Sequence, residues 1–333
     1  MPSLYVHDVA RNGTDVDLVT TLLPILPNLV NLNNLCFIAW NSHPKVLLNL
    51  LHVASSLPCL SSLELRNVRF DGAPFQDILP RFNHLSSLVI MVGDTRQSNI
   101  NYDKEAKETA EIIRTLAPKL VRFEVPGDLV TSDMLAAANW GQLRMLRFVN
   151  HAGNSIQLPP MPCLHTLEYH FSACNDLEVP SYLTSSYIYD ALSPAILSTI
   201  TSLTLSNACS GDGIILRLPE SLEVLRVIAL RDLDLASSFM APAGSQWTQY
   251  HPLNEIDAFQ WINAAGKLPR LAQLTLTLQN APSPAVLNAI AFACPMLRRL
   301  EIEQGGFEAN TSYSPHKLVT RRAIYNFQLV SIS

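Results

Sequence analysis

A short apolar phrase recurs along the chain and constrains its fold more than any other feature. In its full form, leucine or cysteine is followed by proline, an apolar residue, two variable residues and two apolar residues separated by one position. Repetition of this kind is the signature of architectures built from stacked units. Full or near-full copies are LPCLSSLEL (57–65), LPRFNHLSSLVI (79–90), APKLVRFEV (117–125), MPCLHTLEY (161–169), LPESLEVLRV (218–227), LPRLAQLTL (268–276) and CPMLRRLEI (294–302); looser copies are SLYV (3–6), NLNNLCF (31–37), LRMLRF (143–148) and ILSTITSLTL (196–205).

Each copy ends in a pair of apolar residues, and these pairs define eleven units. The distances between successive pairs range from 21 to 49 residues and average close to 30, slightly above the range of about 20–29 of leucine-rich repeats. The uneven spacing predicts an irregular array with long insertions. The pairs are Leu4/Val6, Leu35/Phe37, Leu63/Leu65, Leu88/Ile90, Phe123/Val125, Leu146/Phe148, Leu167/Tyr169, Leu203/Leu205, Leu225/Val227, Leu274/Leu276 and Leu300/Ile302.

Alternation within each phrase predicts a strand whose paired residues face one side. Segments with helical spacing lie between the phrases, at 45–57, 106–117 and 285–294. Helices are expected to begin near Pro44, Asp133 and Pro284, with Ser283 as a cap. The proline that opens the next phrase is a helix stop.

Neither a strand nor a helix of this kind buries its apolar side alone, whereas stacked units complete a continuous core. We therefore expect an α/β leucine-rich-repeat solenoid of about eleven irregular repeats. It would be curved, with parallel strands on the concave face and helices on the convex face. The solenoid would span 1–305, and 306–333 would form a C-terminal tail or cap. An ordinary doubly wound α/β domain is the alternative, although it has no need to repeat one strand-entry phrase.

With these LPxLxxLxL phrases, and with the entry SLYVHD…LVTTLLPILPNLVNLNNLCF (3–37), the sequence resembles the leucine-rich-repeat region of a fungal F-box protein. The resemblance covers roughly residues 3–302. It implies a substrate-recognition role in a ubiquitin ligase, with docking to the cullin adaptor through an F-box. No F-box is found in the sequence, so a cullin adaptor is expected as a partner only if that module lies elsewhere. A stand-alone repeat scaffold is the alternative.

Composition excludes several other functions. The net charge is −5 and neither half carries a block of Lys or Arg, so no nucleic-acid partner is expected. No run of about 18 apolar residues occurs, which argues against a membrane span, and the first residues lack a signal-peptide pattern. Six scattered cysteines fit buried, reduced thiols in a cytoplasmic or nuclear protein.

The sequence offers little catalytic chemistry, and we expect neither an enzyme nor a cofactor. Cys163, His165, His170 and Cys174 are residue types that zinc accepts, but their spacing matches no usual zinc motif, so we expect no metal. Phosphate-loop, nucleophile-elbow and HExxH motifs are absent from the sequence. The acidic cluster Glu105, Glu108 and Glu111 has the spacing of a solvated helix face.

We expect a protein ligand, bound on the strand face away from the core or on the long insertions 92–116, 171–195 and 229–266. Arginine and aromatic side chains dominate binding energy at interfaces, which selects the outward strand residues of these types and their polar neighbours. The aromatics of 229–266, which include Phe259 and Trp261, could contact a ligand or cover the core. The candidates are Tyr5, Glu64, Arg66, Arg147, Glu168, His170, Arg226, Trp247 and Tyr250.

Overall fold

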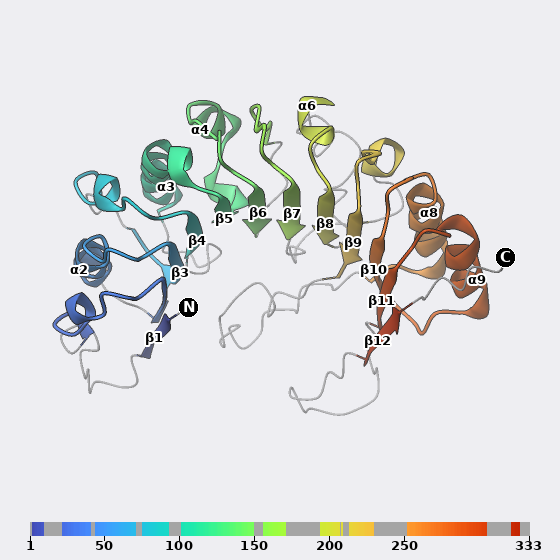
Figure 1. Ribbon diagram of the computed structural model, residues 1–333, viewed down its shortest axis with the longest axis horizontal. Helices are drawn as coiled ribbons and strands as arrows, with labels where there is room; N and C mark the ends of the chain where they lie inside the picture. The colour runs from blue at the N-terminus through green and yellow to red at the C-terminus, as the bar shows by residue number, and fades with distance from the viewer. Residues whose placement is uncertain are drawn as a thin grey trace. The chain divides into compact units, whose positions relative to one another are not determined.

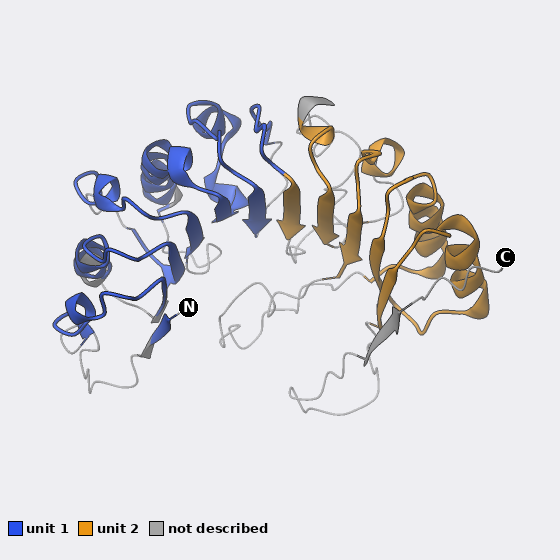
Figure 2. Ribbon diagram, viewed as in Figure 1, with its two compact units in different colours: residues 1–150, 156–164, 236–243 blue, residues 151–155, 165–235, 244–333 orange. Residues whose placement is uncertain are grey.

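A computed structural model describes most of the chain (Figure 1). The described residues are 2–9, 22–40, 44–70, 75–92, 101–149, 156–170, 194–206, 208, 213–229, 252–304 and 321–326. The chain divides into two compact units, coloured separately in Figure 2. Unit 1 contains residues 1–150, 156–164 and 236–243, and unit 2 contains residues 151–155, 165–235 and 244–333.

Unit 1 contains six strands, which pair in parallel with their sequence neighbours. Its helices lie on one side of these strands (Figure 1). The strands are β1 (Ser3–Val9), β2 (Asn34–Trp40), β3 (Ser62–Val68), β4 (Ser87–Val92), β5 (Arg122–Pro126) and β6 (Met145–Val149). The helices are α2 (Pro44–Ala54), α3 (Tyr102–Leu116) and α4 (Ser132–Ala136), and the 3₁₀ turns are η1 (Leu26–Asn28), η2 (Leu79–Arg81), η3 (Ala117–Lys119) and η4 (Gly127–Leu129).

Unit 2 continues the same plan with five parallel strands and closes with one antiparallel strand. The strands are β7 (Thr166–His170), β8 (Ser202–Ser206), β9 (Val224–Ile228), β10 (Gln273–Leu278), β11 (Arg299–Gln304) and β12 (Arg321–Asn326), of which β12 is antiparallel to β11. The helices are α6 (Pro194–Leu197), α8 (Glu255–Ala265) and α9 (Pro284–Ala293), with the 3₁₀ turn η6 (Gly213–Arg217). Strand β12 lies within the segment expected to be a tail or cap.

All eleven apolar pairs lie in strands at the predicted positions, and within each unit neighbouring pairs are in register. For example, Leu35 pairs with Leu63, and Leu274 pairs with Leu300. Nearly all of these side chains are buried, as are leucines two positions after a proline of the phrase, such as Leu60, Leu120 and Leu271. The prediction of an α/β protein with parallel strands stacked in sequence order, as in a solenoid, is confirmed within each unit.

The strand entries share a pattern of backbone hydrogen bonds that joins each strand to the next one. The carbonyl oxygen of the residue before one strand accepts hydrogen bonds from two consecutive N–H groups at the entry of the next strand. The Ser61 oxygen accepts from Ser86 N and Ser87 N at 2.9 and 3.0 Å, and the Ala272 oxygen accepts from Arg298 N and Arg299 N at 2.8 and 3.0 Å. Because buried backbone groups need partners, this repeated bond fixes the alignment of each strand on its predecessor.

Proline in the recurring phrase occupies the first turn of a short 3₁₀ segment. It does so in η1, η2 and η3, where the missing N–H has no partner to lose. The 3₁₀ turn reverses the chain toward the strand and buries its first residue, which is Leu26 in η1 and Leu79 in η2. The phrase therefore encodes a turn followed by a strand.

The three predicted helices are confirmed as α2, α3 and α9. Ser283 caps α9 as expected, because its hydroxyl accepts from Val286 N at 3.3 Å. Thr131 caps α4 in the same way, at 3.3 Å from Met134 N, and α4 begins at Ser132, one residue before the predicted Asp133. The cap of α3 is Asn101, whose side chain accepts from Lys104 N at 3.2 Å.

One prediction for α3 is wrong. The cluster Glu105, Glu108 and Glu111 was expected to form a solvated face, but Glu105 is only 2% exposed. Its two carboxylate oxygens lie 3.1 and 3.0 Å from the Phe70 backbone nitrogen, which donates to them. The spacing of charges along a helix cannot show that a distant part of the chain supplies a hydrogen-bond donor to one of them. Glu105 therefore fastens α3 to the chain that follows β3.

Gly266, directly after α8, is needed for space. Its φ of −63° suits any residue. A Cβ there would lie 2.8 Å from the Ala293 carbonyl oxygen and 2.9 Å from the Ala293 Cβ, closer than atoms pack.

We expect Gly266→Ala to lower the free energy of unfolding by about 1–2 kcal/mol, since overpacking of this kind forces backbone shifts. Urea denaturation measures the loss, and an unchanged midpoint would contradict close packing of α8 against α9. Gly141→Ala is the control, because its nearest neighbour would be the Asn139 side chain at an ordinary 3.4 Å.

Candidate protein-binding surface

In each unit, the residues between the members of the apolar pairs face away from the core and form a row across the strands of that unit. We call this side of the strands the open face and this set of residues the central row. In unit 1, Tyr5 pairs with Cys36, Cys36 with Glu64, Glu64 with Val89, Val89 with Glu124 and Glu124 with Arg147. In unit 2, Glu168 pairs with Thr204, Thr204 with Arg226, Arg226 with Thr275 and Thr275 with Glu301.

Charged side chains of the open face in unit 1 form ion pairs with one another. Glu124 is buried and accepts from Arg147 Nη1 at 3.0 Å and from Arg122 Nη2 at 3.3 Å. Glu64 accepts from Arg66 Nε, two residues along the same strand. A buried carboxylate requires such partners, so these arginines serve the fold of unit 1 in the first place.

In unit 2, the glutamates at both ends of the central row are also buried and paired with basic residues. Glu168 is buried with its Oε2 3.1 Å from His170 Nε2. Glu301 is buried and accepts a hydrogen bond from Arg299 and another, of 3.3 Å, from the Thr275 hydroxyl. Arg226, at the centre of the row, is exposed. Among the described residues, Arg226 makes no ion pair.

The predicted binding residues are thus exposed to different degrees. Tyr5 is 68% exposed and Arg226 is exposed. Glu64, Arg66, Arg147 and His170 are partly exposed, and Glu168 is buried, contrary to the expectation that the whole row faces solvent. Glu64 and Glu168 each form an ion pair with a basic residue two positions along the same strand, Arg66 and His170.

The long insertions are described only in part. Trp247 and Tyr250 lie outside the described residues, as do nearly all of 171–195 and positions 230–251. In the remainder of 229–266, Trp261 is fully buried in α8 and Phe259 is partly exposed. The described aromatic residues of this insertion therefore cover the core more than they offer contact area.

Sequence reasoning placed Thr204 and Thr275 in the outward row without naming them as binding candidates, and it missed Arg122 and Arg299. Arg122 and Arg299 occupy the position two residues before a central-row glutamate, and each donates to it. The repeated Arg-x-Glu at strands β5 and β11 was a signal that could have identified these pairs, because residues two apart share one face of a strand.

The Cys36 thiol lies in the central row beside Glu64. Burial and the Glu64 carboxylate raise the pKa of Cys36 to about 12, and burial raises the pKa of Cys294 to about 11. At pH 8 both therefore stay protonated, with a thiolate fraction of about 0.1% or less, and the thiolate is the reactive form. Cys59 is exposed.

We expect iodoacetamide at pH 8 to modify Cys59 in the native chain while Cys36 and Cys294 stay unmodified. Peptide mass mapping after timed quenching measures this order, and labelling in urea is the control that shows all three sites can react. Modification of Cys36 as fast as Cys59 would contradict its burial in the central row.

The cysteine and histidine group considered for zinc is only partly described. Cys163 belongs to unit 1, His165 and His170 belong to unit 2, and Cys174 lies outside the described residues. Within the described part of the chain, no three His, Cys, Asp or Glu side chains are grouped closely enough to hold a metal ion.

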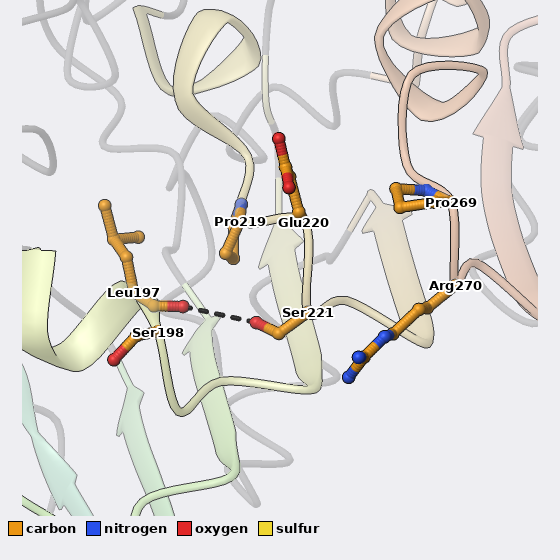
Figure 3. Close-up of a pocket in the computed structure, with 7 residues that line it drawn as sticks. All are labelled: Leu197, Ser198, Pro219, Glu220, Ser221, Pro269 and Arg270. Atoms are coloured by element: carbon orange, nitrogen blue, oxygen red, sulfur yellow. Dashed lines mark hydrogen bonds between the residues drawn. The ribbon is translucent and has the colours of Figure 1, made fainter.

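A hollow of about 530 Å³ lies at the turns that precede β8, β9 and β10. Figure 3 shows it lined by Leu197 and Ser198, by Pro219, Glu220 and Ser221, and by Pro269 and Arg270. The Ser221 hydroxyl donates to the Leu197 carbonyl at 3.3 Å and to the Ile200 carbonyl at 2.7 Å, so its polar atom is used by the fold. The hollow contains none of the predicted binding residues.

No protein-family model matches the chain, and no curated protein matches it. In the described part of the chain, no helix has the length and apolar character needed to cross a membrane.

Proposed function

We propose that the chain is a protein-recognition module of the leucine-rich-repeat type, which binds its partner on the open face of the strands. The observation that carries the proposal is the central row itself. Within each unit its residues are in register across neighbouring strands, and its exposed members are an aromatic and a cationic side chain, Tyr5 and Arg226. Stacked repeats commonly bind partners through such extended strand surfaces.

The exposed members of the row are of the types that supply most binding energy at protein interfaces. Tyr5 and Arg226 offer a large amphipathic ring and a planar cation. The other charges are partly neutralised by one another, which holds their side chains in place. An interface with ordered side chains loses less conformational entropy on binding, so this arrangement supports recognition of a protein more than of a nucleic-acid backbone.

Affinity purification of the tagged chain with matched variants tests this proposal. One variant carries Tyr5→Ala and Arg226→Ala on the open face; the control carries Leu216→Ala and Phe292→Ala, which are exposed elsewhere. We expect partners bound by the wild type to be lost by the first variant and kept by the control. Retention by the open-face variant and loss by the control would overturn the proposal.

The more specific form of the proposal is substrate recognition for a ubiquitin ligase, supported by the resemblance to F-box proteins with leucine-rich repeats. The same purification separates it from a stand-alone scaffold. Recovery of a cullin or its adaptor supports the ligase role, and repeated recovery of partners without either subunit removes it. Location in the cytoplasm or nucleus belongs to this proposal as well.

A further inference from the structure

We infer that Arg226 and Thr204 form an anion subsite on the open face of unit 2, which binds the carboxylate of an acidic side chain in an extended peptide. The inference rests on the proposed function and names the chemistry of the partner. Its starting point is the sequence of the central row in unit 2, which is Glu168, Thr204, Arg226, Thr275 and Glu301 on five successive strands.

In this order of residues, the Arg226 guanidinium has no carboxylate next to it in the row. Its two neighbours in register are threonines. The nearest glutamates of the row lie two strands away on either side, or about 10 Å at the usual strand spacing. Both have partners already: Glu168 has His170, and Glu301 has Arg299 and Thr275. Every other central-row charge is paired, whereas Arg226 makes no ion pair in the described part of the chain.

Thr204 supplies a second, independent sign of a ligand. Its residue is 2% exposed, and its hydroxyl has no hydrogen-bond partner. A buried hydroxyl without a partner is costly, and such groups are rare enough to need an explanation. Thr204 is directly beside Arg226 in the row, on the same face of the sheet. We infer that an acceptor held by the guanidinium of this neighbouring residue, on shifting the side chains that cover Thr204, accepts from the hydroxyl.

The charge balance favours a carboxylate over a phosphate, because arginine binds both groups through two parallel N–H donors. A phosphate dianion would gain only one cation here, and it would be repelled by Glu168 and Glu301 on the two flanks. Val224 and Ile228, two residues before and after Arg226 on the open face, are partly exposed. They offer apolar contacts to the residues that flank the acidic side chain.

Selection from a random heptapeptide library displayed on phage, with the full chain as the bait, tests the inference. We expect the selected peptides to be enriched in Asp or Glu at one position. Synthetic copies with an amidated C-terminus should bind as well as those with a free one, and replacement of the acidic residue by its amide should weaken binding about 10- to 100-fold. Equal binding of the amide form overturns the inference. Loss of binding on amidation of the C-terminus overturns it too, because the carboxylate would then come from the chain end.

Variants of the chain test the assignment of residues. Arg226→Gln should weaken binding of the selected peptide about 10- to 100-fold, and Arg226→Lys less, since charge remains without the planar fork. Arg270→Gln, which removes the same charge from the hollow, is the control and should have no effect. Equal weakening by Arg270→Gln and Arg226→Gln would show general charge attraction and overturn the subsite.

Thr204→Val gives a result that a purely structural role would not give. It removes an unsatisfied hydroxyl, so the midpoint of thermal unfolding should rise by roughly 2–4 °C, while peptide affinity should fall about tenfold. Thr109→Val, in α3 of unit 1, is the matched control, because Thr109 is also buried with an unpartnered hydroxyl. It should raise the midpoint without changing affinity. Unchanged affinity in Thr204→Val would remove Thr204 from the subsite.

The outcomes of the selection also separate this inference from the proposed function. Peptides that bind the open face without an acidic residue would overturn the subsite and leave protein recognition standing. No peptide selected, or peptides whose binding is unchanged by open-face variants, would count against both.

Discussion

Trp140→Ala lowers the free energy of unfolding by about 3–5 kcal/mol, the usual cost of truncating a buried aromatic side chain. Trp140 follows α4 and is among the largest fully buried side chains. Its ring stacks on Phe123 of β5 with centroids 5.7 Å apart, and its Nε1 donates to the Leu135 carbonyl at 2.8 Å. The substitution therefore removes a packed ring and one of two donors to the Leu135 carbonyl, which still accepts from Ala138 N at 3.3 Å.

Urea denaturation measures this loss, and hydrogen exchange at β5 and β6 locates it. Trp140→Phe is the control. It keeps an aromatic ring against Phe123 and loses the hydrogen bond, so we expect a smaller loss of about 1–2 kcal/mol. A loss below about 1 kcal/mol in Trp140→Ala would contradict a close-packed core between α4 and β5.

Glu105→Ala has the second largest expected effect, a loss of about 2–3 kcal/mol, since hydrogen bonds to charged groups contribute about 1.5–3 kcal/mol and a buried donor is left unpaired. The donor is the Phe70 backbone nitrogen, which lies 3.0 and 3.1 Å from the two carboxylate oxygens. Phe70 is itself fully buried against Phe75, with ring centroids 5.3 Å apart. Loss of the carboxylate should therefore loosen the chain after β3.

Denaturation of three variants of α3 checks this account. Glu105→Gln keeps one acceptor oxygen and should lose less than Glu105→Ala. Lys107→Ala changes an exposed charge on the same helix and should change stability little. Amide exchange at Phe70 should become faster in Glu105→Ala alone; an unchanged rate there would mean that the carboxylate does not hold this loop.

The sequence predicted the strands of this protein well because one physical requirement repeats. Each repeat must bury two alternating residues and turn sharply before them. Leu63 and Leu65 in one repeat therefore occupy the same places as Leu274 and Leu276 in another. Register followed from the same alignment, since a slip by one residue would move the paired side chains to the other face. The two compact units, with their boundary near 150–165, have no comparable signal in the sequence.

Prediction was weaker wherever a partner comes from another part of the chain. The outward direction of the central row was predicted, but not that Glu168 is buried beside His170 or that Glu124 is buried beside Arg147 of the next strand. Glu105 shows the same effect across a separation of 35 residues. An exposed charge and a buried, paired charge have the same identity in the sequence, so only the folded contacts distinguish Arg226 from Arg147.

Site-specific photo-cross-linking tests binding by the open face most directly. A photo-reactive residue is placed in turn at Tyr5 and Ile228 on the open face, and at Leu216 and Phe292, which are 84% and 91% exposed elsewhere. We predict that the partner is cross-linked from the open-face positions. Adding Arg226→Gln should reduce the yield of the cross-link from position 228. Cross-links from positions 216 or 292 alone would contradict recognition through the strands.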